Sequence, residues 1–220
     1  MDVPFLNIHT HVYKENTDLE FSLPNIIISQ NQLLAQPCSL GIHPWYIESK
    51  FEAQLDVLYD YGKHSQVLAI GECGLDKLCD TEWELQIQLF RQQIRLANQL
   101  QKPLVIHCVR AYQECIGMLR EEKVAVPVLF HGFDKKPELA QQLLREGFYL
   151  SLGNALLSQH KDALIQEIPL ERLFLETDDK TIRIVDIYTY FCGIRKIEQA
   201  QLKEQLCENF ERIFNYPLRK

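Results

Sequence analysis

The sequence lacks the features that mark several classes of protein. Its 220 residues include 9 Gly and 9 Pro with no low-complexity tract, which excludes collagen-like and disordered chains. The seven cysteines are odd in number and form no C-x-x-C pair, so neither a zinc ribbon nor a disulfide framework is indicated. Positive charge is in deficit, because 23 Lys and Arg face 30 Asp and Glu. The resulting net charge of −7 disfavours non-specific binding to polyanions.

Long hydrophobic runs are also missing. The apolar stretch at 124–130 is far shorter than the roughly 18 residues needed to cross a bilayer, so we expect no membrane partner. The first basic residue is Lys14 and no positively charged start precedes an apolar segment, so we expect no secretory leader. Cysteines without a pairing pattern suit a reducing cytoplasm, and an acidic chain with no evident apolar seam favours a monomer.

What the sequence does contain is a series of eight short apolar runs. They lie at 3–6, 26–28, 37–42, 67–70, 103–106, 126–130, 148–152 and 173–175. Such uninterrupted runs are typical of parallel strands that are covered on both faces. Apolar residues at helical spacing predict helices over 50–61, 81–100 and 198–214, and a further helix from Pro137 to a stop at Gly147. Thr81 and Glu84 have the spacing of a capping box.

Alternating strands and helices without a linker predict one α/β domain over residues 1–220. Division of 220 residues among eight strand–helix units leaves 27.5 residues each, which fits a lean (β/α)₈ TIM barrel with short loops. The alternative is an open doubly wound sheet. Neither a G-x-G-x-x-G motif after the first run nor a G-x-x-x-x-G-K-[ST] motif is present, so a nucleotide cofactor has no evident binding loop.

Imidazoles and carboxylates gather at the carboxyl ends of these runs. They are His9 and His11 after the first run, His43 after the third, Glu72 after the fourth, His107 after the fifth, His131 after the sixth and Asp178 after the eighth. In a (β/α)₈ barrel these ends open onto one face, where catalytic groups collect. The remaining histidines, His64 and His160, are expected at the surface.

This set of residues predicts a metal centre. His9 and His11 are two residues apart on a strand, so both side chains project to the same side. A catalytic ion takes about three protein ligands. Without His43, six ligand candidates remain, and they predict two divalent ions: His9, His11, Glu72, His107, His131 and Asp178. Glu72 lies between small residues and has the freedom to bridge the two ions. Nitrogen and oxygen ligands suit Zn²⁺, Mn²⁺, Co²⁺ or Fe²⁺, with Mg²⁺ also possible.

Several motifs in a fixed order carry a resemblance to a known family. They are His9-Thr10-His11, Gly41 to Pro44, Gly71 to Asp76, Pro103 to His107, His131-Gly132-Phe133, Phe148 to Gly153, Glu176-Thr177-Asp178 and Asn209 to Phe214. With them the chain resembles the TatD-type metal-dependent deoxyribonucleases, a branch of the amidohydrolase-like (β/α)₈ barrels. The resemblance implies cleavage of phosphodiester bonds in DNA, most concretely as a 3′–5′ exonuclease on single strands.

The same resemblance implies how the ligands are shared. One ion would be held by His9, His11, Glu72 and Asp178, and Glu72 would bridge to a second ion held by His107 and His131.

The chain also departs from the family pattern. Asn7 stands where an Asp usually precedes the first His-x-His, and Val109 replaces a basic residue, with Arg110 one position further on. After Asp178 the chain continues with 179–181 in place of Ala-Pro and is tens of residues shorter than typical members. We expect substrate contacts from that loop to be missing.

Roles in catalysis follow from these positions. Asp178 is the best candidate to accept a proton from the attacking water, and Glu72 is the second catalytic carboxylate. His43, Arg110 and Lys135 are the candidate contacts to substrate phosphates, against the alternatives of a structural turn and a solvated rim. The indole of Trp45 would then be placed to stack on a base.

Other functions remain open at the level of the sequence. The same ions on a similar barrel would also serve hydrolysis of an amide, an ester or a lactone. A third hypothesis is a metal-binding barrel that has no catalytic activity and acts as a binding protein.

Overall fold

The computed structural model describes residues 3–28, 34–157 and 161–218. Its strands, in chain order, are β1 (Phe5–Thr10), β2 (Glu20–Ile27), β3 (Cys38–Gly41), β4 (Val67–Asp76), β5 (Leu104–Val109), β6 (Val128–Phe130), β7 (Tyr149–Leu152) and β8 (Leu173–Leu175). Each of the eight predicted runs contributes to one of these strands. Every strand pairing described in the ladders is parallel.

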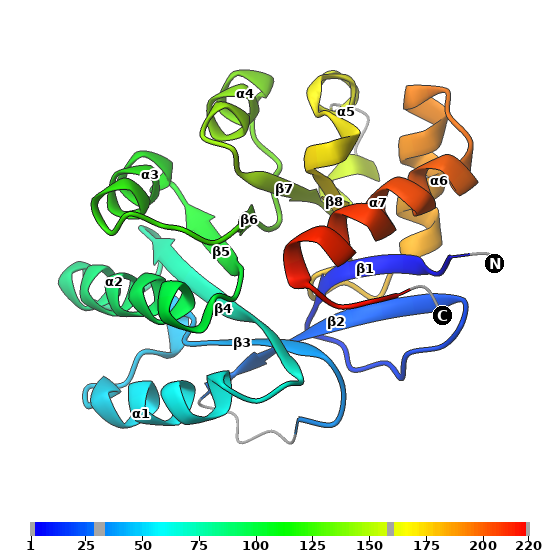
Figure 1. The fold of residues 1–220 in the computed structure, drawn as a ribbon. Coiled ribbons are helices and arrows are strands. Elements are labelled where there is room, and N and C mark those ends of the chain that lie inside the picture. Colours follow the sequence, from blue (N-terminus) through cyan, green and yellow to red (C-terminus); the bar gives the residue numbers. More distant parts are fainter. Residues whose placement is uncertain (1–2, 29–33, 158–160, 219–220) are drawn as a thin grey trace. The chain divides into compact units, whose positions relative to one another are not determined.

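Helices alternate with the strands through most of the chain (Figure 1). The α-helices are α1 (Phe51–Gly62), α2 (Trp83–Leu100), α3 (Tyr112–Glu121), α4 (Pro137–Arg145), α5 (Asp162–Glu167), α6 (Ile184–Arg195) and α7 (Gln199–Phe214). Short 3-10 turns are η2 (Pro44–Tyr46), η3 (Asn154–Leu157) and η4 (Leu170–Arg172). None of the helices in the described ranges combines the length and apolar character that spanning a bilayer requires.

Two compact units make up the chain. The first unit comprises Met1–Pro24 and Leu129–Lys220, and the second comprises Asn25–Val128. In the first unit the strands follow the order β6, β7, β8, β1 and the first part of β2. In the second unit the rest of β2 pairs with β3, which is followed by β4 and β5. That residues 1–220 form one domain, as the sequence analysis expects, stays a prediction.

Each unit has an apolar core of strand and helix side chains. In the first unit Phe174, Phe210 and Phe214 form a buried aromatic group in which α7 packs against β8. In the second unit α2 packs on β4, with Phe90 and Ile94 buried. The predicted helical spacing of α2 is therefore the spacing of its buried face.

Two local predictions were wrong. Thr81 and Glu84 form no capping box, since α2 has Glu82 as its N-cap residue without a side-chain cap. The Thr81 hydroxyl instead donates to the carbonyl of Pro44 at 2.7 Å, across a long separation in sequence. Strand β4 does not end before Glu72 but continues to Asp76, so Glu72 lies within the strand.

A candidate metal centre

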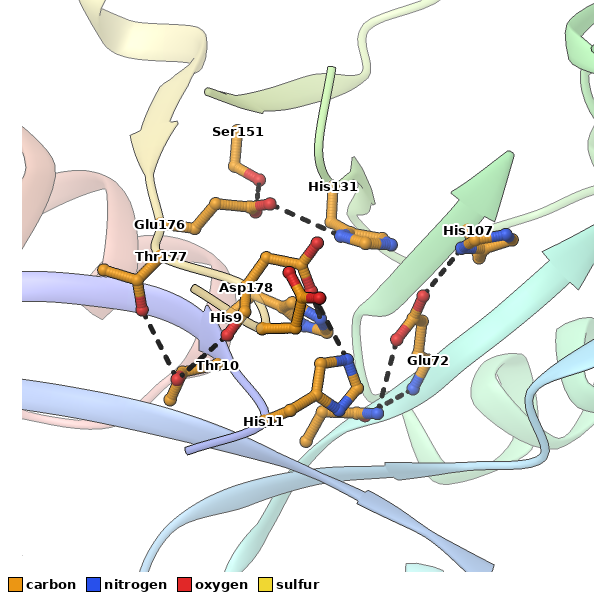
Figure 2. A network of polar contacts seen from close by, with 12 residues as sticks. His9, Thr10, His11, Glu72, His107, His131, Ser151, Glu176, Thr177 and Asp178 are labelled. Atoms are coloured by element: carbon orange, nitrogen blue, oxygen red, sulfur yellow. Dashed lines mark hydrogen bonds and ion pairs between the residues drawn. The ribbon is translucent and has the colours of Figure 1, made fainter. Parts of the chain in front are cut away.

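In the first unit, backbone pairing brings Asp178 between two histidines. Asp178 follows β8 and forms an isolated parallel bridge with Thr10 of β1. Its N–H donates to the His9 carbonyl and its carbonyl accepts from the His11 N–H, each at 3.1 Å. Asp178 has a φ of 53°, a left-handed conformation that Asp tolerates better than most residues. Thr10 adds a hydroxyl bond to the same carbonyl at 3.2 Å (Figure 2).

Asn7 has a structural role in the first unit. Its side chain is fully buried and bonds twice to Thr177, accepting from the Thr177 N–H at 3.0 Å and donating to the Thr177 hydroxyl at 2.9 Å. The amide thereby joins β1 to the segment after β8, one residue before Asp178. Asn7 therefore positions the backbone beside the candidate site.

The side chains of this region form what we call the first cluster: His9, His11, His131, Glu176 and Asp178. The Asp178 Oδ1 atom lies 3.7 Å from His9 Nε2 and 3.4 Å from His11 Nε2. The rings of His9 and His131 have centroids 4.2 Å apart. Ligand atoms of His9, His131 and Asp178 all lie within 4.8 Å of one another.

Glu176 orients His131 within the first cluster. Its carboxylate is fully buried, accepts a bond from the Ser151 hydroxyl and lies 3.4 Å from His131 Nδ1 (Figure 2). Burial alone would raise the pKa of the Glu176 carboxyl, but the bond and charge of His131, with smaller contributions from His9 and Ser151, lower it. An ionised Glu176 keeps the His131 proton on Nδ1 and leaves the Nε2 lone pair available to a ligand.

In the second unit, Glu72 is fixed by its backbone and by Asn25. The register of β4 and β5 shifts between Gly71 and Cys73, so Glu72 lies at a bulge, a feature that redirects a side chain. Asn25 accepts from the Glu72 N–H at 2.6 Å and its amide group lies 3.4 Å from Glu72 Oε2. The Glu72 side chain is 2% exposed, so a buried acid is held in one orientation.

Gly74 allows β4 and β5 to approach closely beside this acid. A Cβ atom at Gly74 would lie 2.0 Å from the His107 carbonyl oxygen, and the φ of 142° is one that other residues rarely adopt. Glycine at this position therefore allows the backbone of His107 to lie directly against β4.

The second cluster, as we name it, consists of His43, Glu72, Asp76 and His107. His107 presents Nδ1 to Glu72 Oε1 at 2.8 Å and Nε2 to Asp76 Oδ2 at 3.2 Å. Burial would raise the pKa of Asp76, but bonds from Trp45, the Leu78 N–H and His107 lower it overall. An ionised Asp76 is an acceptor for a proton on His107 Nε2. The 2.8 Å between His107 Nδ1 and Glu72 Oε1 is a hydrogen-bond distance, so an ion held by these two atoms would take the place of the proton between them.

His43 has a different role from His107. Its Nδ1 accepts from the Trp45 N–H at 3.1 Å, which places the proton of the neutral ring on Nε2. That Nε2–H lies 3.2 Å from Glu72 Oε1. A nitrogen that carries a proton has no lone pair for a metal ion. His43 is therefore a hydrogen-bond donor, although its atoms lie within ligand distance of Glu72 and His107.

The donor atoms of the first cluster have a spacing that fits a divalent transition metal. Two ligand atoms that each lie about 2.1 Å from a tetrahedral ion are about 3.4 Å apart. The two Asp178–imidazole distances of 3.4 and 3.7 Å are close to this value and long for hydrogen bonds. Burial raises the pKa of the Cys73 thiol, with the charge of Glu72 adding to the effect, so Cys73 is protonated and is a poor ligand.

Of the three predicted phosphate contacts, His43 belongs to the second cluster, and Arg110 and Lys135 lie outside both clusters. Arg110 is exposed directly after β5 and has a φ of 54°. Lys135 is exposed after β6 and pairs with Asp134 Oδ1 at 2.5 Å. Their assignment to substrate stays a prediction. His64 is exposed as expected, and His160 lies outside the described residues.

Sequence reasoning missed three residues that hold the candidate ligands: Asn25, Ser151 and Glu176. Each is a buried polar residue in or next to an apolar strand. Glu176 could have been found from its position two residues before Asp178, which is the spacing that places His9 and His11 on one side.

The chain is similar in sequence to a known protein family and to several of its members. Residues 8–215 match the family model described as TatD related DNase. An uncharacterized metal-dependent hydrolase of Buchnera aphidicola is 32% identical over 199 residues, covering 81% of this chain and 74% of the relative. A mouse protein described as a putative deoxyribonuclease is 34% identical over 162 residues, covering 66% of this chain and 54% of the relative.

Solved structures show the same fold. A TatD homologue from Escherichia coli K12 superposes with a TM-score of 0.84 at 20% identity, covering 99% of this chain and 100% of the other. A TatD-family hydrolase from Entamoeba histolytica gives 0.79 at 18% identity, covering 97% and 98%. The predicted (β/α)₈ fold class is confirmed.

Proposed function

Because the chain belongs to the TatD-related DNases, a family of metal-dependent hydrolases, we propose that it cleaves phosphodiester bonds in DNA. The specific form of the proposal is a 3′–5′ exonuclease on single strands. The mouse relative is described as a putative deoxyribonuclease, which supports DNA as the substrate class. The observation that carries the proposal is the donor set of the first cluster, where Asp178 lies at metal-sharing distances from two imidazoles.

Six residues would hold two divalent ions. They are His9, His11, His131 and Asp178 of the first cluster and Glu72 and His107 of the second. A bound divalent ion lowers the pKa of water and polarises a phosphoryl oxygen, which is the chemistry that hydrolysis of a phosphodiester needs. The bridging role of Glu72, and the choice among zinc, manganese, cobalt, iron and magnesium, stay predictions.

Asp178 is the residue that we assign to proton transfer. Its side chain is 38% exposed, whereas Glu72 is 2% exposed and hydrogen-bonded, so Asp178 is the carboxylate that water reaches. Three hydrogen bonds fix the Asp178 backbone beside Thr10, so its carboxylate starts from a fixed position. Glu72 contributes the second catalytic charge.

His43, Arg110 and Lys135 are the proposed contacts to substrate phosphates. The single Nε2–H of His43 lies beside Glu72, so a bond from it to a phosphoryl oxygen would take the place of the bond to Glu72. Arg110 and Lys135 are exposed cations after β5 and β6, where the strand ends lie.

A nuclease assay on metal-loaded protein tests the proposal. Purified protein is reconstituted separately with each candidate metal and incubated with a 5′-labelled single-stranded oligonucleotide. We expect a ladder that shortens from the 3′ end, and its loss in Glu72→Gln. Glu84→Gln, an exposed acid in the same unit, is the matched control and should retain activity. Turnover of an amide, ester or lactone without release of nucleotides would overturn the proposal.

Location and assembly belong to the same proposal. We infer a cytoplasmic monomer, supported by seven cysteines that are all free thiols. Light scattering of the purified protein should return the mass of one chain.

A further inference from the structure

We propose that Trp45 is a stacking platform for the nucleobase next to the cleaved phosphate. This inference rests on the proposed function and narrows its substrate class, from phosphodiesters in general to those that carry a base. Trp45 is 56% exposed although it is among the largest apolar side chains of the protein. It belongs to the 3-10 turn η2, two residues after His43.

Trp45 is exposed and at the same time held in place. Its indole Nε1–H donates to Asp76 Oδ2 at 2.7 Å, and Asp76 is buried. The turn itself is anchored on both sides: Thr81 donates to the Pro44 carbonyl, and Gln54 donates to the Tyr46 carbonyl at 2.9 Å. An exposed ring that is fixed in this way loses little conformational entropy when a planar ligand stacks on it.

The platform is adjacent to the second cluster. The Trp45 ring centroid is 5.1 Å from that of His43 and 5.9 Å from that of His107, with ring planes at 84° and 75°. Both histidines meet the indole at steep angles, so neither is stacked parallel to it. A base that stacked on Trp45 would have its phosphate near the His43 Nε2–H.

Leu78 extends the exposed apolar surface at the same carboxylate. It is 60% exposed, and its backbone N–H donates to Asp76 Oδ1 at 2.7 Å. One buried acid, which also bonds to His107, therefore holds the Trp45 indole and the backbone of Leu78. Single exposed apolar residues are common on protein surfaces, but a pair fixed beside candidate catalytic groups is suited to binding.

The net charge of the protein gives an independent reason to expect stacking of a base on Trp45. A protein with a net charge of −7 gains little affinity for DNA from its overall field. Stacking on an aromatic ring adds affinity that does not depend on net charge and accepts every base, because each base has a π-face. This is the requirement of an enzyme that removes nucleotides one after another.

Fluorescence tests the platform without catalysis. The chain has two tryptophans, so Trp83→Phe leaves Trp45 as the single reporter. In chelator, oligo(dT) should quench this emission, and an abasic strand of equal length should bind about tenfold more weakly and quench little. Trp45→Ala, with Trp83 intact, should lose the preference for oligo(dT) in a labelled-strand binding assay. Trp45→Phe should restore part of it. Tyr61→Ala, which removes an exposed aromatic from α1, should leave it unchanged.

The comparison of abasic and normal strands separates stacking from a structural effect, because both strands are tested on the same protein. Equal affinity for the two strands, with no quenching, would overturn the platform. If the metal-loaded protein degrades DNA and Trp45→Ala leaves KM unchanged, the platform fails and the proposed function stands. If oligo(dT) quenches Trp45 but no metal supports hydrolysis, Trp45 is a binding contact for bases only, and the proposed function fails.

Discussion

The two clusters hold their acids in different ways. Glu72 of the second cluster is 2% exposed and lies 2.8 Å from His107 Nδ1 and 3.2 Å from His43 Nε2. Asp178 of the first cluster is 38% exposed, and its distances to His9 and His11 are 3.7 and 3.4 Å. Hydrogen bonds of the protein therefore fix Glu72, whereas a shared ion is the contact that the spacing around Asp178 suits.

The two clusters share one feature: in each, a buried carboxylate lies at a ring nitrogen of a histidine. Asp76 orients His107 in the second unit and Glu176 orients His131 in the first. Both acids have a lowered pKa, so each is a charged acceptor that fixes the position of one imidazole proton. The difference between the clusters thus lies in the candidate catalytic acids and not in the residues behind them.

The largest expected effects come from the two catalytic acids. Glu72→Gln and Asp178→Asn should each lower kcat by about a thousandfold.

The same two variants should differ in their free energy of unfolding. Glu72→Gln should lower the free energy of unfolding by about 2 kcal/mol, because the new amide faces buried donors. Asp178→Asn should change it by less than about 0.5 kcal/mol, since Asn tolerates a positive φ and the site is half-exposed. Urea denaturation measures both values. If the two variants lose the same free energy of unfolding, the claim that the clusters hold their acids differently is wrong.

The next effect tests whether the second cluster depends on the close approach of β4 and β5. Gly74→Ala should destabilise the protein by about 2–3 kcal/mol, because the added Cβ overlaps the His107 carbonyl. Gly117→Ala in α3 is the matched control. A Cβ there meets open space, so it should stabilise the protein by about 0.5–1 kcal/mol. Thermal unfolding measures both, and an unchanged Tm in Gly74→Ala would contradict this view of β4.

A smaller effect should be common to both units. Asp76→Asn and Glu176→Gln should each weaken the binding of a divalent ion by about 10- to 100-fold, because each histidine loses the charged acceptor that fixes its proton. Competition titration with a metal-sensitive dye measures this, with Glu84→Gln as the control. If one variant alone weakens binding, the proposed parallel between the clusters is wrong.

The smallest effect is the pH dependence of stability. The folded-state pKa of Glu176 lies below its unfolded value of about 4.3. The stability that it contributes is therefore present above that value and is lost as the pH falls through the folded pKa. Glu176→Gln should unfold more easily than the wild type near neutral pH, and the gap should narrow below about pH 4. Glu171 is an exposed acid, so Glu171→Gln should have nearly the same free energy of unfolding as the wild type at every pH.

The fold could be predicted because apolar runs report burial on both faces of a strand. The limits of strands were harder to predict where the run is interrupted. In β4 the apolar run stops at Ile70, yet the strand continues through Gly71 and Gly74 to Asp76. Its second half depends on close contact with β5, which no local pattern reveals. The hydroxyl of Thr81 was misassigned for the same reason, because its partner, the Pro44 carbonyl, is distant in sequence.

The candidate ligands could be predicted from their types and positions, but their supporting residues could not. Asn25, Ser151 and Glu176 lie among apolar residues, where a polar side chain has several possible partners. Which partner it takes is decided by pairing with other strands. The tautomer of His43, which separates a donor from a ligand, depends on the backbone of Trp45 and needed the structure.

Metal stoichiometry tests the central claim most directly. Metal-depleted protein is dialysed against Zn²⁺ or Mn²⁺, and bound metal is measured by plasma mass spectrometry in the wild type, His131→Asn, His107→Asn and His64→Asn. We predict two ions per chain in the wild type, fewer in His131→Asn and His107→Asn, and an unchanged number in His64→Asn, whose histidine is exposed and belongs to neither cluster. A wild-type protein that binds no ion, or three variants with equal metal content, would contradict the account.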